Sequence, residues 1–353
     1  MSPGAPPARV LVVEDSKVVR ELLVFLLDRE PQLQVVGTAA DGEGALAAVE
    51  RLRPDVITMD IHMPKMDGLE ATRRIMQTRP TPIVIVSACA VQDEVTATFR
   101  AVEAGALAFV EKPGLLCVDS ARWLVDTVKA MSGVRVVRRW PARSEAVRGG
   151  AGLLAPRPVS LVAIGASTGD PLVLRAILSA LPRDFPAAIA IVQHISPGFA
   201  AGFADWLGRN YPVALASEGQ RLLPGRAYVA PDGLHLAVRR EKLGQPGVWV
   251  SLSAGEMEHG HRPSVSRLFR SVSQTLGAEA VGVLLSGMGS DGAAELKLMR
   301  DRGALTIAQS PETCVVAGMP GVAIERGAAA CVLPPDGIAA ALCEVVGRSG
   351  SGI

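Results

Sequence analysis

Three residues in the second half of the chain, Ser167, His194 and Asp291, carry the side chains that a serine hydrolase needs. Ser167 lies in the turn Gly165-Ala-Ser-Thr-Gly169, which fits the G-x-S-x-G nucleophile elbow. His194 ends an apolar segment, and Asp291 lies in a glycine-dense turn after another. A serine hydroxyl attacks only when a base takes its proton, and a carboxylate must fix the tautomer of that base. This set predicts acyl transfer through a serine intermediate.

Each of these residues also has a structural interpretation. Serine and aspartate are common helix N-caps, so Ser167 and Asp291 could be ordinary caps. The turn at 165–169 could also bind phosphate, although it lacks the lysine of a P-loop and the G-x-G-x-x-G spacing. Three successive strand ends that carry Ser, His and Asp favour the hydrolase. The order Ser, Asp, His of the α/β-hydrolases is absent, because no histidine follows His261, so we expect a different α/β fold.

A second group of polar residues follows apolar segments in the first part of the chain: Glu14, Asp15, Asp60, Ser87 and Lys112. The carboxyl ends of parallel strands meet at one edge of an open sheet, so these side chains should converge. Clustered carboxylates repel one another, and Mg²⁺ relieves such a site because it binds carboxylate and phosphate oxygens. A single carboxylate here could be an N-cap, but five polar positions on successive strand ends favour a phosphorylation switch centred on Asp60.

The elements that position the switch residues alternate between strands and helices. Apolar segments predict strands at 9–13, 33–39, 56–59, 83–86 and 106–110. Apolar residues at helical spacing follow several of them, as in 18–26 and 45–52, and a last helix is expected at 120–130. Five such β–α units predict a parallel sheet that is covered on both faces.

The pattern breaks between residues 131 and 158. This stretch contains the arginines at positions 135, 138, 139, 143, 148 and 157, with Gly149, Gly150 and two prolines near its end. We expect a solvated tether, with a basic docking segment as the alternative. The predicted organisation is a disordered N-terminus at 1–8, one domain at 9–130, the basic linker at 131–158 and a second domain at 159–349.

A second α/β series positions the hydrolase residues. Buried strands are predicted at 159–164, 187–192, 281–285 and 305–308, and helices at 172–180, 199–208, 264–274 and 293–302. Shorter strands at 227–230, 234–238 and 248–252 are predicted to form a β-hairpin insert.

Composition excludes several classes of protein. No apolar run reaches the roughly 18 residues of a membrane span, and residues 1–9 lack the layout of a signal peptide. We therefore expect a cytoplasmic protein without membrane insertion. The 36 basic and 35 acidic residues give a net charge of +1, which argues against a nucleic-acid partner. The five cysteines form no C-x-x-C pair, so neither a disulfide framework nor a zinc knuckle is expected.

The first 130 residues resemble the receiver domain of bacterial response regulators. The matching segments are Val10-Leu-Val-Val-Glu14-Asp15-Ser16, Asp60-Ile-His-Met-Pro64, Met66-Asp67-Gly68, Ser87-Ala88 and Gly105-Ala-Leu-Ala-Phe109-Val-Glu-Lys112-Pro113. The resemblance implies a flavodoxin-like sheet in the order 2-1-3-4-5 and phosphorylation of Asp60 by a CheA-type histidine kinase.

The same resemblance assigns roles to single residues. It implies that Mg²⁺ is held by Glu14, Asp15, Asp60 and the backbone carbonyl of His62, whose side chain we expect to face solvent. It also implies three switch residues: Ser87 binds the phosphoryl group, Phe109 moves in response, and Lys112 balances the charge.

Residues 159 to about 345 resemble the catalytic domain of the CheB family of chemotaxis protein-glutamate methylesterases. The matching segments are Ile164-Gly-Ala-Ser-Thr-Gly169, Val192-Gln-His-Ile-Ser-Pro-Gly-Phe199, Tyr228-Val-Ala-Pro-Asp232, His261-Arg-Pro-Ser-Val265, Gly287-Met-Gly-Ser-Asp-Gly-Ala293, Ala308-Gln and Cys314-Val-Val-Ala-Gly-Met-Pro320. The resemblance implies a doubly wound α/β domain with a mainly parallel sheet.

The family resemblance also implies the chemistry. Ser167 would be the nucleophile, His194 the general base and Asp291 its orienting carboxylate, with support from Thr168 and from backbone N–H groups near His194 and Met288. The expected substrates are glutamate γ-methyl esters on chemoreceptors, with deamidation of receptor glutamines as a second activity. No cofactor is expected for the esterase chemistry, and we expect a monomer.

Some features fit the family less closely. Asp170 stands where the family usually has a second glycine, and Ser196 replaces a frequent proline. The pair His259 and His261 could chelate zinc on a strand, although no third ligand follows at a suitable spacing. A transcription regulator is disfavoured because the output half is long and not basic. A receptor-binding adaptor without catalysis is disfavoured by the complete Ser, His and Asp set.

Overall fold

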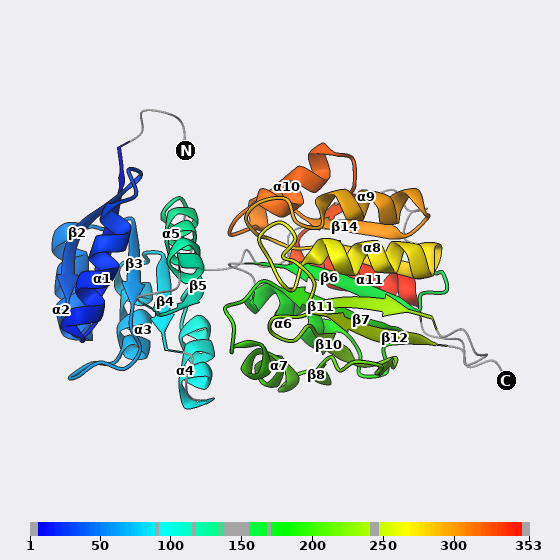
Figure 1. Ribbon diagram of the computed structural model, residues 1–353, viewed down its shortest axis with the longest axis horizontal. Coiled ribbons are helices and arrows are strands. Elements are labelled where there is room, and N and C mark those ends of the chain that lie inside the picture. Colours follow the sequence, from blue (N-terminus) through cyan, green and yellow to red (C-terminus); the bar gives the residue numbers. More distant parts are fainter. Residues whose placement is uncertain are drawn as a thin grey trace. The chain divides into compact units, whose positions relative to one another are not determined.

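The computed structural model describes residues 6–88, 92–114, 118–134, 136, 155–167, 171–240 and 247–347. The chain divides into two compact units, Met1–Ala142 and Arg143–Ile353 (Figure 1). None of the helices in the described segments combines the length and the apolar character that a membrane span requires. The predicted domain limits remain predictions, because most of the segment 131–158 lies outside these residues.

The first unit contains a sheet of five parallel strands in the order β2-β1-β3-β4-β5, which confirms the predicted order. Its strands are β1 (Ala8–Val13), β2 (Leu33–Ala39), β3 (Val56–Met59), β4 (Ile83–Ser87) and β5 (Ala108–Glu111). Its helices are α1 (Lys17–Asp28), α2 (Gly42–Leu52), α3 (Gly68–Thr78), α4 (Gln92–Glu103) and α5 (Val118–Ser132). Helices α2, α3 and α4 pack against one another in turn, and α1 packs against α5.

The order of the strands places the switch residues. Strands β1 and β3 are neighbours although β2 lies between them in sequence, so the direction of winding reverses at β1. Ligands bind at such switch points, beyond the carboxyl ends of the strands. Glu14 directly follows β1 and Asp60 directly follows β3, so the two carboxylates meet there.

The second unit contains a sheet of seven parallel strands in the order β15-β14-β13-β6-β7-β10-β8. Its strands are β6 (Leu161–Ala166), β7 (Ala188–Gln193), β8 (Val213–Leu215), β10 (Ala227–Val229), β13 (Ala280–Leu284), β14 (Leu305–Gln309) and β15 (Cys331–Leu333). The helices are α6 (Pro171–Ala180), α7 (Ala200–Gly208), α8 (Val265–Leu276), α9 (Ala293–Asp301), α10 (Gly318–Glu325) and α11 (Pro335–Val346), with short 3₁₀ turns at Gly277–Glu279 and Pro311–Thr313. The predicted parallel α/β fold is confirmed.

A separate three-stranded antiparallel sheet, β11-β12-β9, lies in the second unit (Figure 1). It contains β9 (Arg221–Leu222), β11 (His235–Arg239) and β12 (Val248–Ser253). The prediction of a hairpin insert holds for β11 and β12 but is wrong for the segment 227–230. That segment forms β10, which pairs in parallel with β7 and β8 in the main sheet.

The central position of β6 explains where the second polar cluster forms. Strand β6 pairs with β13 on one side and with β7 on the other. The chain winds from β6 through β7 in one direction and returns to β13 on the opposite side, so β6 is the switch point of this sheet. The turns that follow β6, β7 and β13 carry Ser167, His194 and Asp291.

Candidate active site

The backbone of Ser167 is held by both neighbouring strand ends. Its N–H donates to the carbonyl of Ser286 over 3.1 Å, and the side chain of Gln193 donates to its carbonyl over 2.7 Å. A Cβ at Gly165 would lie 2.3 Å from a methyl group of Val265, so only glycine lets β6 pass this close to α8. The hydroxyl is therefore fixed at the end of β6 and is almost fully buried.

His194 lies between the other two members of the set. Its Nδ1 is 3.2 Å from the Ser167 Oγ, and its Nε2 is 2.9 Å from Oδ2 of Asp291. The exposed fractions of Ser167, His194 and Asp291 are 1%, 5% and 1%. The three predicted residues therefore form one continuous, buried chain of polar contacts.

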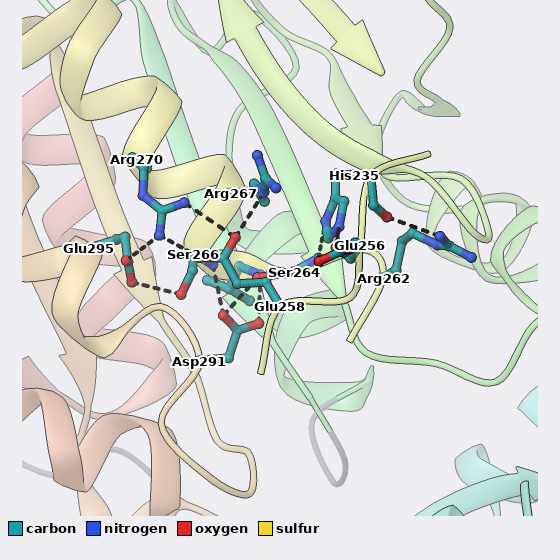
Figure 2. Close-up of polar contacts among 12 residues, drawn as sticks. His235, Glu256, Glu258, Arg262, Ser264, Ser266, Arg267, Arg270, Asp291 and Glu295 are labelled. Atoms are coloured by element: carbon teal, nitrogen blue, oxygen red, sulfur yellow. Dashed lines mark hydrogen bonds and ion pairs between the residues drawn. The ribbon is translucent and has the colours of Figure 1, made fainter. Parts of the chain in front are cut away.

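Asp291 accepts three further hydrogen bonds from the start of α8. The Ser264 Oγ–H and the Ser266 N–H donate to its Oδ1, each over 2.9 Å, and the Val265 N–H donates to its Oδ2 over 2.8 Å (Figure 2). Burial alone would raise the pKa of Asp291, but the hydrogen bonds from His194 and Ser266 hold it well below its ordinary value. The carboxylate therefore stays ionised at neutral pH.

This charge determines which nitrogen of His194 carries the proton. An ionised carboxylate only accepts hydrogen bonds, so the Nε2 that faces Asp291 must be protonated. In the neutral ring, Nδ1 then presents its lone pair to the Ser167 hydroxyl. A serine next to a base oriented in this way can lose its proton as it attacks a carbonyl.

The backbone N–H groups around the set differ in their availability. The His194 N–H donates to the carbonyl of Ala166 over 2.9 Å, so it is not free to bind a developing oxyanion. The Gly287 N–H donates to the carbonyl of Val316 over 2.9 Å. The Met288 N–H pairs with none of the residues that the structure describes. Met288 therefore keeps its predicted role as an oxyanion donor, which stays a prediction.

Two predicted features lie outside the described residues. Thr168, predicted to support His194 or the substrate, and Asp170, which replaces a family glycine, fall within the segment 168–170. Ser196, the other departure from the family pattern, is buried. The structure gives no sign of what its hydroxyl changes.

The start of α8 was not predicted to belong to the site. Ser264 was predicted only as the first residue of the helix 264–274, and nothing in the sequence pairs it with Asp291. The Ser266 Oγ–H donates to Glu295 over 2.7 Å, and Glu295 also binds Arg270 over 2.7 Å (Figure 2). His261 was considered only as a zinc ligand, yet its ring lies against the ring of His194.

The first unit gathers the predicted carboxylates at one point. Ligand oxygens of Glu14, Asp15 and Asp60 all lie within 4.8 Å of one another, and this is the only such group of three possible metal ligands within the described segments. Lys112 Nζ lies 3.0 Å from both Asp60 Oδ2 and Glu14 Oε2. Burial and the nearby Asp60 raise the pKa of Glu14. This mutual repulsion of oxygen ligands fits a hard cation such as Mg²⁺.

The other predicted switch residues lie around this cluster. Ser87 ends β4 and is buried, with its Oγ–H donating to the carbonyl of Ala88 over 3.4 Å. Phe109 is half-buried on β5, and its ring meets the ring of Phe99 edge-on, with centroids 5.3 Å apart. The side chain of His62 is exposed, as expected.

The fold and the two clusters define a two-unit protein that joins a phosphorylation-type switch to a hydrolase-type α/β unit. Residues 10–116 match the family described as response regulator receiver domain, and residues 162–342 match CheB methylesterase. The catalytic domain of Thermotoga maritima CheB methylesterase is 35% identical, with a TM-score of 0.50, and the match covers 52% of this chain and 97% of that domain.

Relatives match along almost the whole chain. One, "protein-glutamate methylesterase/protein-glutamine glutaminase 1" from Syntrophus aciditrophicus, is 54% identical over 96% of this chain and 98% of the relative. Another with the same description, numbered 4, from Geobacter metallireducens, is 50% identical over 96% and 98%. The chain belongs to the CheB methylesterase family.

Proposed function

We propose that this chain is a phosphorylation-activated protein-glutamate methylesterase that also acts as a protein-glutamine glutaminase. The observation that carries the proposal is the buried chain of contacts from Ser167 through His194 to Asp291, within a unit that matches CheB methylesterase. The names of the relatives supply the substrate class. The biological role would be adaptation in chemotaxis-type signalling.

In the proposed reaction, the Ser167 Oγ attacks the carbonyl carbon of a glutamate γ-methyl ester while Nδ1 of His194 takes the hydroxyl proton. The bond to the methoxy group then breaks, and His194 returns the proton so that methanol leaves. Water attacks the acyl-enzyme, again with His194 as the base, and releases the glutamate and the free serine. Asp291 holds the ring and stabilises the imidazolium that forms in each step.

The groups proposed to stabilise the oxyanion are the Met288 N–H and the neighbourhood of Thr168. The same groups serve glutamine deamidation, because an amide has the same carbonyl and differs only in its leaving group. His194 then gives its proton to the amide nitrogen, so that ammonia leaves instead of methanol.

The first unit is the proposed control. Asp60 would accept a phosphoryl group from a CheA-type histidine kinase, Lys112 would balance its charge, and Ser87 and Phe109 would respond to it. Glu14, Asp15, Asp60 and the His62 carbonyl would hold a Mg²⁺ ion, which would supply positive charge for the phosphoryl oxygens. Phosphorylation then shifts a conformational equilibrium towards the active enzyme. We further propose a monomer that acts in the cytoplasm on methyl-accepting chemoreceptors.

The test is methanol release from a methylated receptor, measured with and without a small phosphodonor and Mg²⁺. We expect the wild-type protein to release methanol faster with phosphodonor. Ser167→Ala should release none, and Asp60→Asn should keep its basal rate without stimulation. An active Ser167→Ala protein would refute the esterase, and a stimulated Asp60→Asn protein would refute the switch.

A further inference from the structure

His261 lies face to face with the proposed catalytic base. The ring centroids of His261 and His194 are 3.7 Å apart, and the angle between the ring planes is 14°. The Ser–His–Asp contacts do not include His261, because both nitrogens of His194 already face Ser167 and Asp291. The stacked ring is therefore a third, separate restraint on His194.

A tight turn presents this ring. Glu258 and His261 exchange both backbone hydrogen bonds, over 3.1 and 3.0 Å. The two residues between them, His259 and Gly260, have φ angles of 54° and 79°. Two left-handed residues at the corner are typical of a tight hairpin turn. The turn thus fixes the direction in which the His261 side chain leaves the backbone.

Ion pairs tie the turn to α8, the helix whose start holds Asp291. The carboxylate of Glu258 binds Arg267 over 2.8 Å and also binds Arg270, which continues to Glu295 (Figure 2). The hydrogen bond from Arg270 holds the pKa of Glu258 below its ordinary value, so its carboxylate stays charged. The turn and the carboxylate that orients His194 therefore share one support.

The residues on both sides of the turn are held as well. His235 on β11 binds the carbonyl of Glu256 through Nε2 over 2.8 Å, and its Nδ1 accepts the Ser264 N–H over 3.2 Å. The guanidinium of Arg262 donates to the carbonyl of Gly255 over 3.0 Å. These bonds, also seen in Figure 2, restrain the loop on either side of the turn.

The stack opposes a motion that the other contacts resist only weakly. The hydrogen bonds to Ser167 and Asp291 hold the two edges of the His194 ring, but small changes in the side-chain torsions can still tilt the ring out of its plane at little cost to these bonds. A flat group packed on the face of the ring opposes this tilt. Proton transfer depends on the alignment of Nδ1 with the serine hydroxyl, so the tilt bears directly on the rate.

The charge state of His261 suits this position. Burial and the neighbouring His194 lower the pKa of His261 to about 3, although the carboxylate of Asp291 acts in the opposite direction. His259, on the same turn, adds to the lowering. His261 is therefore neutral near pH 7 and does not repel the imidazolium that forms at His194 during the reaction.

We propose that His261 is a positioning residue that holds the plane of the His194 ring through its stacked face. This inference rests on the proposed function only in that His194 acts as the base for Ser167. It assigns no contact between His261 and substrate. It predicts that a flat, uncharged ring stacked on His194 is the feature of position 261 on which the labelling rate mainly depends.

The experiment compares variants of the full chain by the rate at which a serine-directed phosphonate labels Ser167. His261→Ala and His261→Leu should label about 10- to 100-fold more slowly than wild type. His261→Phe should label at close to the wild-type rate, because it retains a flat ring. His259→Asn is the matched control on the same turn and should behave as wild type, since asparagine tolerates a left-handed backbone.

Methanol release separates positioning from substrate binding. The slow variants should lose kcat with little change in KM, and their thermal unfolding should match that of wild type. Normal labelling of His261→Ala, or of His261→Leu if the alanine variant does not fold, would overturn the proposal. Slow labelling of His261→Phe would do the same. A wild-type protein that is labelled but releases no methanol would instead refute the proposed substrate and leave this comparison valid.

Discussion

Replacing Asp291 by asparagine tests the central contact of the site. The carboxylate accepts four hydrogen bonds, from Ser264 and Ser266 on Oδ1 and from Val265 and His194 on Oδ2. An amide keeps one acceptor and replaces the other by an NH₂ group. If the NH₂ group replaces Oδ2, it faces the Val265 N–H, and if it replaces Oδ1, it faces the Ser266 N–H. In either orientation one buried donor loses its partner.

The size of the effect follows from these contacts. An unsatisfied buried donor costs about 1–3 kcal/mol, and lost negative charge at the start of α8 costs about 1 kcal/mol more. If the NH₂ faces His194, the ring must accept there and carry its proton on Nδ1, where it cannot act as a base. If the ring keeps its tautomer, no charge stabilises the imidazolium. We expect kcat to fall about 10³- to 10⁴-fold, as in other triads.

Urea denaturation and methanol release measure the two effects, and Asp301→Asn at the exposed end of α9 is a matched control. The lowered pKa of Asp291 means that its stabilisation is complete above the unfolded value of about 4 and is lost as the pH falls further. The stability difference between wild type and Asp291→Asn should therefore be full at pH 7 and shrink in acid. A variant with wild-type stability at pH 7, or with more than a tenth of wild-type kcat, would refute this reasoning.

Two further substitutions test the surroundings of the set. A Cβ at Gly287 would lie 2.5 Å from the Cβ of Ser167 and 2.4 Å from the sulfur of Met319. Gly287→Ala should therefore slow phosphonate labelling about 10- to 100-fold. An unchanged labelling rate would contradict this packing. Glu258→Gln weakens the pairing with Arg270, so labelling should slow less than in a variant without the stacked ring. Full wild-type labelling would show that the ion pair does not support the turn.

The sequence predicted the receiver-like unit well because its signals are local. The strand at 56–59 is an apolar segment bounded by Asp55 and Asp60, and the observed limits of 33–39 and 56–59 agree with the prediction. In a parallel sheet the carboxyl ends of the strands meet at one edge, and this rule predicts that the polar residues at the strand ends, including Asp60, lie together. A local pattern and a single topological rule were therefore enough for the strands and the polar edge of this sheet, whereas its strand order was implied by the family resemblance.

The short strands of the second unit could not be predicted in the same way. Strands β8, β9 and β15 have only two or three residues, too few to show a period of two. The segment 227–230 was misassigned because its pairing with β7 and β8 depends on partners distant in sequence. Such strands are defined by their neighbours and not by their own composition.

The candidate site was likewise predicted only where its signals are local in the sequence. Strand-end reasoning selected Ser167, His194 and Asp291, which lie in contact. It could not give the nitrogen of His194 that faces each partner, because that depends on the rotamer of one ring. It also missed the stacking of His261, because a turn fixed by ion pairs to α8 places that ring against His194.

For Asp291, the sequence left two interpretations, helix cap or orienting carboxylate. The same carboxylate contacts both the start of a helix and His194. Helix α9, which follows Asp291 directly, has Gly292 as its N-cap and gains no side-chain cap. The carboxylate instead accepts the first N–H groups of α8, whose own N-cap Ser264 donates to Asp291 and caps nothing. A carboxylate fixed by a helix start cannot rotate away from His194, and the helix charge keeps it ionised. The bonds that stabilise α8 therefore also orient the proposed base, so a substitution of Asp291 must change stability and activity together.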